Sequence, residues 1–173
     1  SSNPGLIPNP TATYSSPNAT GSLTLRPATN ATGSATINVT INDSQGQNNT
    51  VTRSFTVTVN PVNDAPTISD ITNQSVNEDT STPALPFTIG DVETPATSLT
   101  VNASSSNPSL VPNSNIVLGG SGASRTVTVT PAATLSGSAV ITLTVDDGSG
   151  GTATDTFTLT VNPINQTPTL DPI

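Results

Sequence analysis

Carboxylate and amide side chains gather in a few short stretches of this sequence, where their oxygen atoms could bind a metal ion. The chain has 173 residues, with 11 acidic residues against 3 basic ones. Clustered carboxylates without basic partners repel each other unless a cation sits among them. Ca²⁺ takes roughly six to eight oxygen ligands from carboxylates, amides and backbone carbonyls. Calcium as a cofactor is therefore one interpretation, and its candidate metal ligands are Asn63, Asp64, Glu78, Asp79, Asp91, Glu93, Asp146 and Asp147.

A second interpretation of the same residues involves no metal. Asp and Asn are good turn formers because their side chains hydrogen-bond to the nearby backbone. Acidic residues also keep a secreted protein soluble. Spacing alone leaves both interpretations open.

Other chemistry is poorly supported by the residue types present. His and Cys are absent, which excludes a Ser–His or Cys–His nucleophile and the usual zinc sites. A glycosidase-like pair of carboxylates would need aromatic side chains to bind a sugar, yet the chain has one Tyr and three Phe. The Gly-rich stretches at 119–122 and 148–151 lie between expected strands and indicate hairpin turns, not phosphate loops. We expect no catalytic residues, no organic cofactor and no enzymatic activity.

The charge balance also limits the partners of the chain. Its net charge is −8, and Arg26, Arg53 and Arg125 are its whole basic complement. Nucleic-acid binding depends on Lys and Arg that neutralise phosphates, so we expect no nucleic-acid partner. The sequence has no apolar run of about 18 residues, and we expect no membrane insertion by this segment.

An internal repeat is the strongest signal in the sequence. Residues 1–8 (SSNPGLIP) match residues 105–112 (SSNPSLVP) at an offset of 104. Residues 55–61 (FTVTVNP) match residues 157–163 (FTLTVNP) at an offset of 102, because the intervening loop is shorter by two residues in the second copy. Length changes of this kind concentrate in exposed loops.

The repeat defines three segments. We expect residues 1–62 to be the C-terminal portion of one repeat, residues 63–163 to be a complete repeat, and residues 164–173 to be the first strand of a following repeat. The sequence thus begins and ends inside a module. Either a longer chain continues the array, or neighbouring subunits of a polymer complete the broken modules.

The complete repeat predicts an all-β fold. Apolar β-branched residues alternate with polar ones, as in 35–41 (ATINVTI), which is the period of half-buried strands and argues against disorder. Strands are expected at 67–75, 84–90, 97–103, 109–118, 124–130, 138–145 and 154–162. About seven short strands separated by turns are typical of an immunoglobulin-like β-sandwich, so tandem sandwiches of this type are the expected architecture.

Strands that run alternately up and down would sort the acidic stretches to the two ends of the sandwich. Asn63 and Asp64, the loop that contains Asp91 and Glu93, and the turn at 146–147 should converge at the end where the linker enters. Glu78 and Asp79 should lie at the opposite end, beside Asn165 of the next linker.

Three motifs in these stretches resemble the bacterial cadherin-like tandem repeats of large surface proteins and adhesins. They are VNPVNDAPT at 59–67, VNEDT at 76–80 and IGDVE at 89–93. The resemblance implies calcium between consecutive domains, with Asn63 and Asp64 as the linker ligands, Glu78 as the strand Glu, and Asp91 with Glu93 in place of an Asp-x-Asp motif. The sequence departs from that pattern at Gln166, which replaces the residue equivalent to Asp64.

Together these features predict an extracellular spacer repeat of a secreted or cell-surface adhesin or fibre, rigidified by calcium at its junctions. Its partners would be the neighbouring repeats of the same chain and like subunits in a fibre. Two alternatives stay open. One is a module that binds a carbohydrate or protein ligand on a cell surface, and the other is a self-assembling filament subunit.

Overall fold

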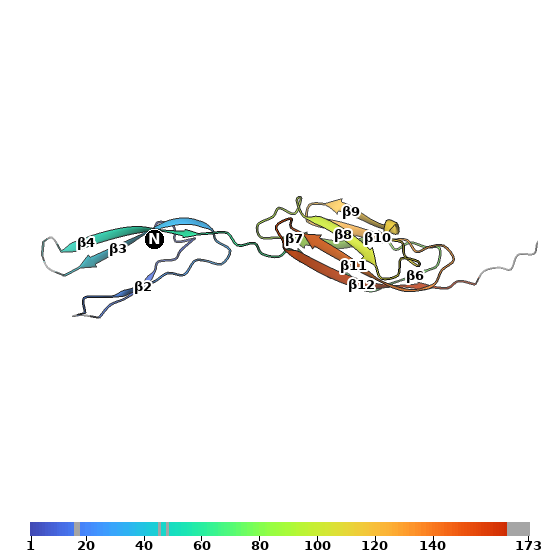
Figure 1. Ribbon diagram of the computed structural model, residues 1–173, viewed down its shortest axis with the longest axis horizontal. Helices are drawn as coiled ribbons and strands as arrows, with labels where there is room; N and C mark the ends of the chain where they lie inside the picture. The colour runs from blue at the N-terminus through green and yellow to red at the C-terminus, as the bar shows by residue number, and fades with distance from the viewer. Residues whose placement is uncertain (16–17, 45, 48, 166–173) are drawn as a thin grey trace, which may run out of the picture. The chain divides into compact units, whose positions relative to one another are not determined.

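The computed structural model describes residues 1–15, 18–44, 46–47 and 49–165. The chain divides into two compact units, Ser1–Val62 and Asn63–Ile173, which we call unit 1 and unit 2. The described residues form strands and one short 3₁₀ helix, which confirms the all-β prediction (Figure 1). The predicted strand at 164–173 lies mostly outside the described residues.

Unit 2 is a sandwich of two four-stranded sheets. One sheet has the order β5-β7-β10-β9 and the other the order β6-β12-β11-β8. Their bounds are β5 Thr67–Ile68, β6 Gln74–Asn77, β7 Leu85–Gly90, β8 Thr100–Ser105, β9 Ile116–Ser121, β10 Ser124–Val129, β11 Gly137–Asp146 and β12 Thr152–Asn162. The pairs are antiparallel except β12 with β6, which is parallel.

Apolar residues at alternate positions of these strands form a single core between the sheets. In β11 the residues at 139, 141, 143 and 145 are buried, while their neighbours face outward. Such alternation follows from the period of two in a strand. Phe157 on β12 is the largest fully buried side chain and pairs in register with Ile141.

Two of the predicted strands are wrong. The first, at 67–75, is divided into β5 and β6, which belong to different sheets, and the backbone N–H of Ile71 between them donates to the carboxylate of Asp155 at 3.0 Å. The other, at 109–118, begins with a turn in which the N–H groups of Leu110 and Val111 donate to the carbonyl of Asn107. A short 3₁₀ helix, η1 (Asn113–Asn115), follows before β9 starts.

Unit 1 contains two antiparallel pairs, β1 (Thr11–Thr13) with β2 (Ser22–Thr24) and β3 (Gly33–Asn42) with β4 (Thr50–Val59). The β3–β4 hairpin has the register of β11–β12, since Ile37 lies opposite Phe55 as Ile141 lies opposite Phe157.

Individual hydrogen bonds recur at the offset of 104. Ser2 N donates to Thr36 O at 2.9 Å, and Ser106 N donates to Val140 O at 2.9 Å. The side-chain hydroxyl of each serine accepts the N–H of the same partner, again at 2.9 Å in both units. The sequence repeat is therefore also a repeat of backbone geometry.

Candidate functional site

The first residue of unit 2 is hydrogen-bonded to the turn between β11 and β12. Asn63 Nδ2 donates to Asp147 Oδ2 at 2.7 Å, across 84 positions of sequence. Asp147 Oδ1 accepts the N–H groups of Ser149 at 2.6 Å and Gly151 at 3.0 Å. One carboxylate thus closes the turn and holds the entering chain.

These hydrogen bonds stabilise the ionised form of Asp147. The side-chain donor of Asn63 is the largest cause that lowers the pKa of this carboxyl, followed by the backbone N–H of Ser149. Burial opposes this effect, since Asp147 is only 6% exposed. The net pKa lies below the ordinary range of an Asp, because several donors favour the charged form.

Gly151 allows the entering chain to approach this turn. A Cβ atom at this position would collide with Asp147 Oδ2. It would also lie 3.1 Å from both Ala65 Cα and Asn63 Nδ2, which is tighter than ordinary contact. The sequence predicted only a hairpin turn at Gly151 and missed this role, because the close approach involves residues far away in the chain.

A second contact holds the next residue of the linker. The backbone N–H of Asp64 donates to Glu93 Oε2 at 3.1 Å. Asp91 Oδ1 accepts the N–H groups of Glu93 at 2.9 Å and Thr94 at 2.6 Å, so it shapes the loop that carries Glu93. Asp91 Oδ2 is buried and has no hydrogen-bond partner among the described residues.

Asp146 lies in the same turn as Asp147 but has a local role. Its Oδ1 accepts the N–H of Gly148 at 2.6 Å, and its backbone carbonyl accepts the Thr100 hydroxyl at 3.5 Å. The hydrogen bonds described above bring Asn63 to Asp147 and the backbone of Asp64 to Glu93 at this end of unit 2.

The other end of unit 2 has its own carboxylate contact with a linker. Glu78 is 6% exposed, and its Oε1 accepts the backbone N–H of Ile164 at 2.9 Å. The N–H of Glu78 donates to Asn162 O at 2.8 Å, which extends the parallel pairing of β6 with β12. Asp79 has a left-handed backbone (φ 63°), and its Oδ1 accepts the N–H of Thr134 at 2.9 Å.

The family of this chain follows from a sequence comparison. The family model described as "Bacterial Ig domain" matches residues 63–160, which is more than half of the chain. The chain belongs to the bacterial Ig domain family. No curated protein sequence matches it significantly.

Solved structures similar to this bacterial Ig protein include domains of a surface layer protein and of titin. Domains 1–6 of the surface layer protein SbsC match with 20% identity and a TM-score of 0.46, over 95% of this chain and 19% of that one. SbsC domains 4 and 5 match with 23% identity and a TM-score of 0.44, over 92% of this chain and 67% of that one. The titin M3 domain matches with 18% identity and a TM-score of 0.41, over 56% of this chain and 96% of that one. The chain therefore spans about a fifth of the length of the SbsC domain 1–6 structure.

Contacts join some predicted metal ligands of the Ig domain, namely Asn63 with Asp147, the backbone of Asp64 with Glu93 and the backbone of Glu93 with Asp91, and the other predicted ligands have separate partners. Within the part of the chain that the structure describes, no group of three His, Cys, Asp or Glu residues lies close enough to hold a metal ion. Most of the predicted ligands instead accept hydrogen bonds from nearby or linker backbone. Calcium binding stays a prediction, supported by the unpartnered and buried Asp91 Oδ2.

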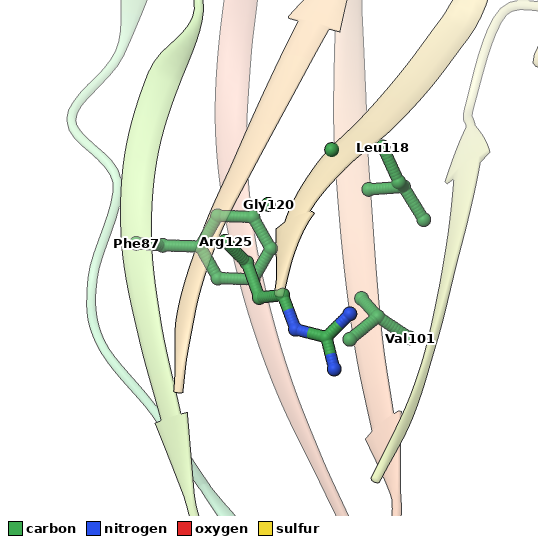
Figure 2. A pocket seen from close by; sticks show the side chains of 6 residues that line it. Phe87, Val101, Leu118, Gly120 and Arg125 are labelled. Carbon is green, nitrogen blue, oxygen red and sulfur yellow. The ribbon is translucent and has the colours of Figure 1, made fainter. Parts of the chain in front are cut away.

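Arg125 is the single basic residue of the Ig domain and was not assigned a role from sequence. Figure 2 shows its side chain extending from β10 toward Val101, in a cavity of about 100 Å³ that Phe87 and Leu118 also line. Its Nε donates to Gly122 O at 2.8 Å, and its Nη2 donates to Ala96 O at 3.2 Å. The guanidinium thus ties loop carbonyls together at the edge of the core.

Among the described residues of this bacterial Ig protein, no helix has the length and apolar character needed to cross a membrane.

Proposed function

We propose that the chain is a structural spacer repeat of a secreted or cell-surface protein. The observation that carries this proposal is that unit 2 holds chain segments at both of its ends through carboxylates. Asp147 and Glu93 bind the entering residues Asn63 and Asp64, and Glu78 binds the leaving residue Ile164. A domain that hydrogen-bonds to its own linkers is suited to hold neighbouring repeats in a fixed orientation.

The mechanism is mechanical and needs no catalytic step. In a linear array each repeat contacts only its neighbours, so the stiffness of the whole depends on the linkers. Pro61, Pro66 and Pro163 flank or lie within the two linkers and restrict the backbone there. The hydrogen bonds of Asn63, Asp64 and Ile164 shorten the freely rotating part of each linker further.

NMR relaxation of the full chain would test this role. If the linkers are stiff, the amides of units 1 and 2 should report one common rotational correlation time. The double variant Asn63→Ala with Glu93→Ala should separate the two values, because the entering residues would then rotate freely. Independent tumbling of the units in the unmodified chain would rule out a stiff spacer.

We propose calcium at the entering linker as a second function of the same residues. The buried and unpartnered Asp91 Oδ2 favours it, because a buried carboxylate oxygen without a donor is costly unless a cation or water satisfies it. Asp91 would be the first ligand at this end, and Glu93, Asp64 and Asn63 would have to move toward it to complete the site, because the described carboxylates do not lie close enough together as they stand. Asp146 and Asp147 lie in the turn that contacts Asn63. Glu78 and Asp79 would serve the opposite end. The ion would supply positive charge that draws the linker to the loops.

A further inference from the structure

Arg125 is the only basic residue of unit 2, and its positive charge has no acidic partner within the described residues. Its guanidinium makes three hydrogen bonds, from Nε to Gly122 O at 2.8 Å and from Nη2 to Ala96 O at 3.2 Å and Leu99 O at 3.5 Å. All three acceptors are backbone carbonyls. The charge is therefore balanced by dipoles and not by a carboxylate.

The loop between β7 and β8 supplies two of these carbonyls and also carries Asp91 and Glu93. Asp91 Oδ1 accepts the N–H groups of Glu93 and Thr94. Glu93 Oε2 accepts the N–H of Asp64. These carboxylates thus bind backbone donors, although they lie in the same loop as the carbonyls that hold the guanidinium.

One nitrogen of the guanidinium is available to a ligand. Nη1 of Arg125 donates to no atom of the described residues. Among these residues Asp91 Oδ2 is the one buried side-chain atom without a partner, so Nη1 is open to solvent. The planar guanidinium matches a carboxylate in shape, and charge-assisted hydrogen bonds between the two groups are short and strong.

The cavity beside this guanidinium has the size and the lining for a short apolar stem. Its volume is about 100 Å³, and Figure 2 shows Phe87, Val101 and Leu118 around it. Gly120 lies directly opposite Arg125 in register and has no side chain to fill the space. An apolar cavity of about 150 Å³ holds benzene, so this one admits a smaller group, such as a carboxylate on one or two methylene carbons. Val101, Leu118 and Arg125 are partly exposed, so the cavity opens to solvent.

Unit 1 shows that the repeated strand pattern does not require an arginine at this position. At the offset of 104, Val127 of β10 corresponds to Leu23 of β2, which keeps the apolar character. Arg125 corresponds to Gly21, which has no side chain. The arginine and its cavity are therefore particular to unit 2.

We propose that the cavity at Arg125 is a binding site for a carboxylate group on a short aliphatic stem. Nη1 would donate to the carboxylate, and Val101 and Leu118 would contact the stem. A free short-chain acid and the acidic side chain of another protein share this chemistry, and peptide binding distinguishes the two sources. This inference concerns the cavity between β8 and β9 and does not depend on the spacer role of the linkers.

NMR of the full chain labelled with ¹⁵N-arginine tests the site, because the Nε–H signals come only from Arg26, Arg53 and Arg125. Sodium propionate, exchanged for sodium chloride at constant ionic strength, should shift the Arg125 signal in a saturable manner. Half-saturation is expected at about 1–10 mM for so small a ligand. The signals of Arg26 and Arg53 are internal controls and should not saturate. Propionamide, which has the same shape without the charge, should leave the Arg125 signal unchanged.

Two variants separate the contribution of the guanidinium from that of the cavity. Arg125→Lys keeps the charge but loses the planar fork, so propionate should bind about tenfold more weakly, as measured by the methyl signals of Leu118. Val101→Phe fills the cavity and keeps Arg125, and it should abolish the saturable shift of the Arg125 Nε signal. Val117→Phe is the matched control, because Val117 is 59% exposed and lies outside the cavity lining. If Arg125→Lys fails to fold, the comparison of Val101→Phe with Val117→Phe still decides the outcome.

A capped Gly-Glu-Gly peptide, compared with capped Gly-Gln-Gly, identifies the source of the carboxylate. If the Glu peptide binds more tightly than propionate, the site accepts the acidic side chain of a protein. If it does not, the site accepts a free acid. Equal shifts of all three arginine signals, an equal response to propionamide, or a saturable shift that survives in Val101→Phe would overturn the proposal.

Discussion

Asn63 Nδ2 lies 2.7 Å from Asp147 Oδ2, and this hydrogen bond joins the start of the Ig domain to the turn between its last two strands. The two residues are 84 positions apart in sequence. Their contact makes the linker part of the folded domain.

Acid should weaken the contact of Asp147. The pKa of this carboxyl is lower in the folded state, so protons bind the unfolded state more readily. Its contribution to stability is fully present above the ordinary Asp pKa of about 4, and it is lost as the pH falls through the lowered folded value. Urea unfolding between pH 7 and 2 should show a steeper acid loss for the unmodified chain than for Asp147→Asn. Asp70→Asn, at an exposed position, is the control, and equal acid slopes in the unmodified chain and Asp147→Asn would contradict this expectation.

Adding one methyl group at Gly151 should displace the linker. Gly151→Ala forces a Cβ against Asp147 Oδ2 and close to Asn63 and Ala65. Overpacking of this kind costs about 1–3 kcal/mol, and hydrogen exchange of the β11 and β12 amides would measure it. Gly46→Ala is the matched control, because Gly46 lies in the equivalent hairpin loop of unit 1 and a Cβ there has nothing within 4 Å. If the β11 and β12 amides are equally protected from exchange in Gly151→Ala and Gly46→Ala, the close approach of the linker to Gly151 is unimportant for stability.

Glu78 should keep the linker that leaves unit 2 ordered. Glu78→Ala removes the acceptor of the Ile164 N–H, so this amide should exchange with solvent faster by roughly tenfold. Glu78→Gln keeps an acceptor oxygen at the same position and should retain most of the protection. NMR exchange rates of Ile164 would measure both. If the two variants lose protection equally, the carboxylate charge, and not the acceptor alone, holds the linker.

Equivalent phenylalanines should differ in their importance for stability. Phe157→Ala should destabilise unit 2 by about 3–5 kcal/mol, because it opens a cavity in a closed core. Phe55→Ala should cost far less, because 42% of Phe55 is already exposed. Hydrogen exchange of β11–β12 and β3–β4 amides in the full chain would separate the two effects. A comparable loss in both units would show that the Phe55 face is covered in solution.

Calcium should raise the stability of unit 2 if the prediction for the entering linker is correct. An ion at a hundred times its dissociation constant stabilises by about 2.7 kcal/mol, which calorimetry of the full chain with Ca²⁺ or with a chelator would detect. Asp91→Asn should abolish the gain, whereas Asp70→Asn should leave it unchanged. If Ca²⁺ and the chelator give the same melting temperature, the calcium prediction is wrong.

The strands were largely predictable because their signal is local. Alternation of Val, Ile and Thr with outward polar residues predicts β10, β11 and β12 to within two residues at each end. The repeat at offsets of 104 and 102 predicts the equivalence of β3–β4 with β11–β12, because both hairpins use the same apolar pattern.

The two wrong strands have different causes, one local and one distant in sequence. Leu110 and Val111 are both buried, which an alternating strand would not allow, and they belong to a turn around Asn107. The interruption between β5 and β6 is stabilised by Asp155, a residue 84 positions beyond Ile71. The turn at Asn107 lies within a short window and could have been recognised from Asn107-Pro108, whereas the contact of Ile71 with Asp155 could not.

Sequence alone determined the fold class, the repeat and the sorting of the acidic residues to the two ends of the sandwich, since these follow from periodicity and strand direction. Only the tertiary structure decided that Asp147 is bound by Asn63, that Glu93 accepts the N–H of Asp64, and that Glu78 reaches Ile164. The physical reason is that a carboxylate can be stabilised either by a cation or by N–H donors. Whether a given carboxylate binds a cation or accepts hydrogen bonds depends on the N–H donors that folding brings to it from distant parts of the chain.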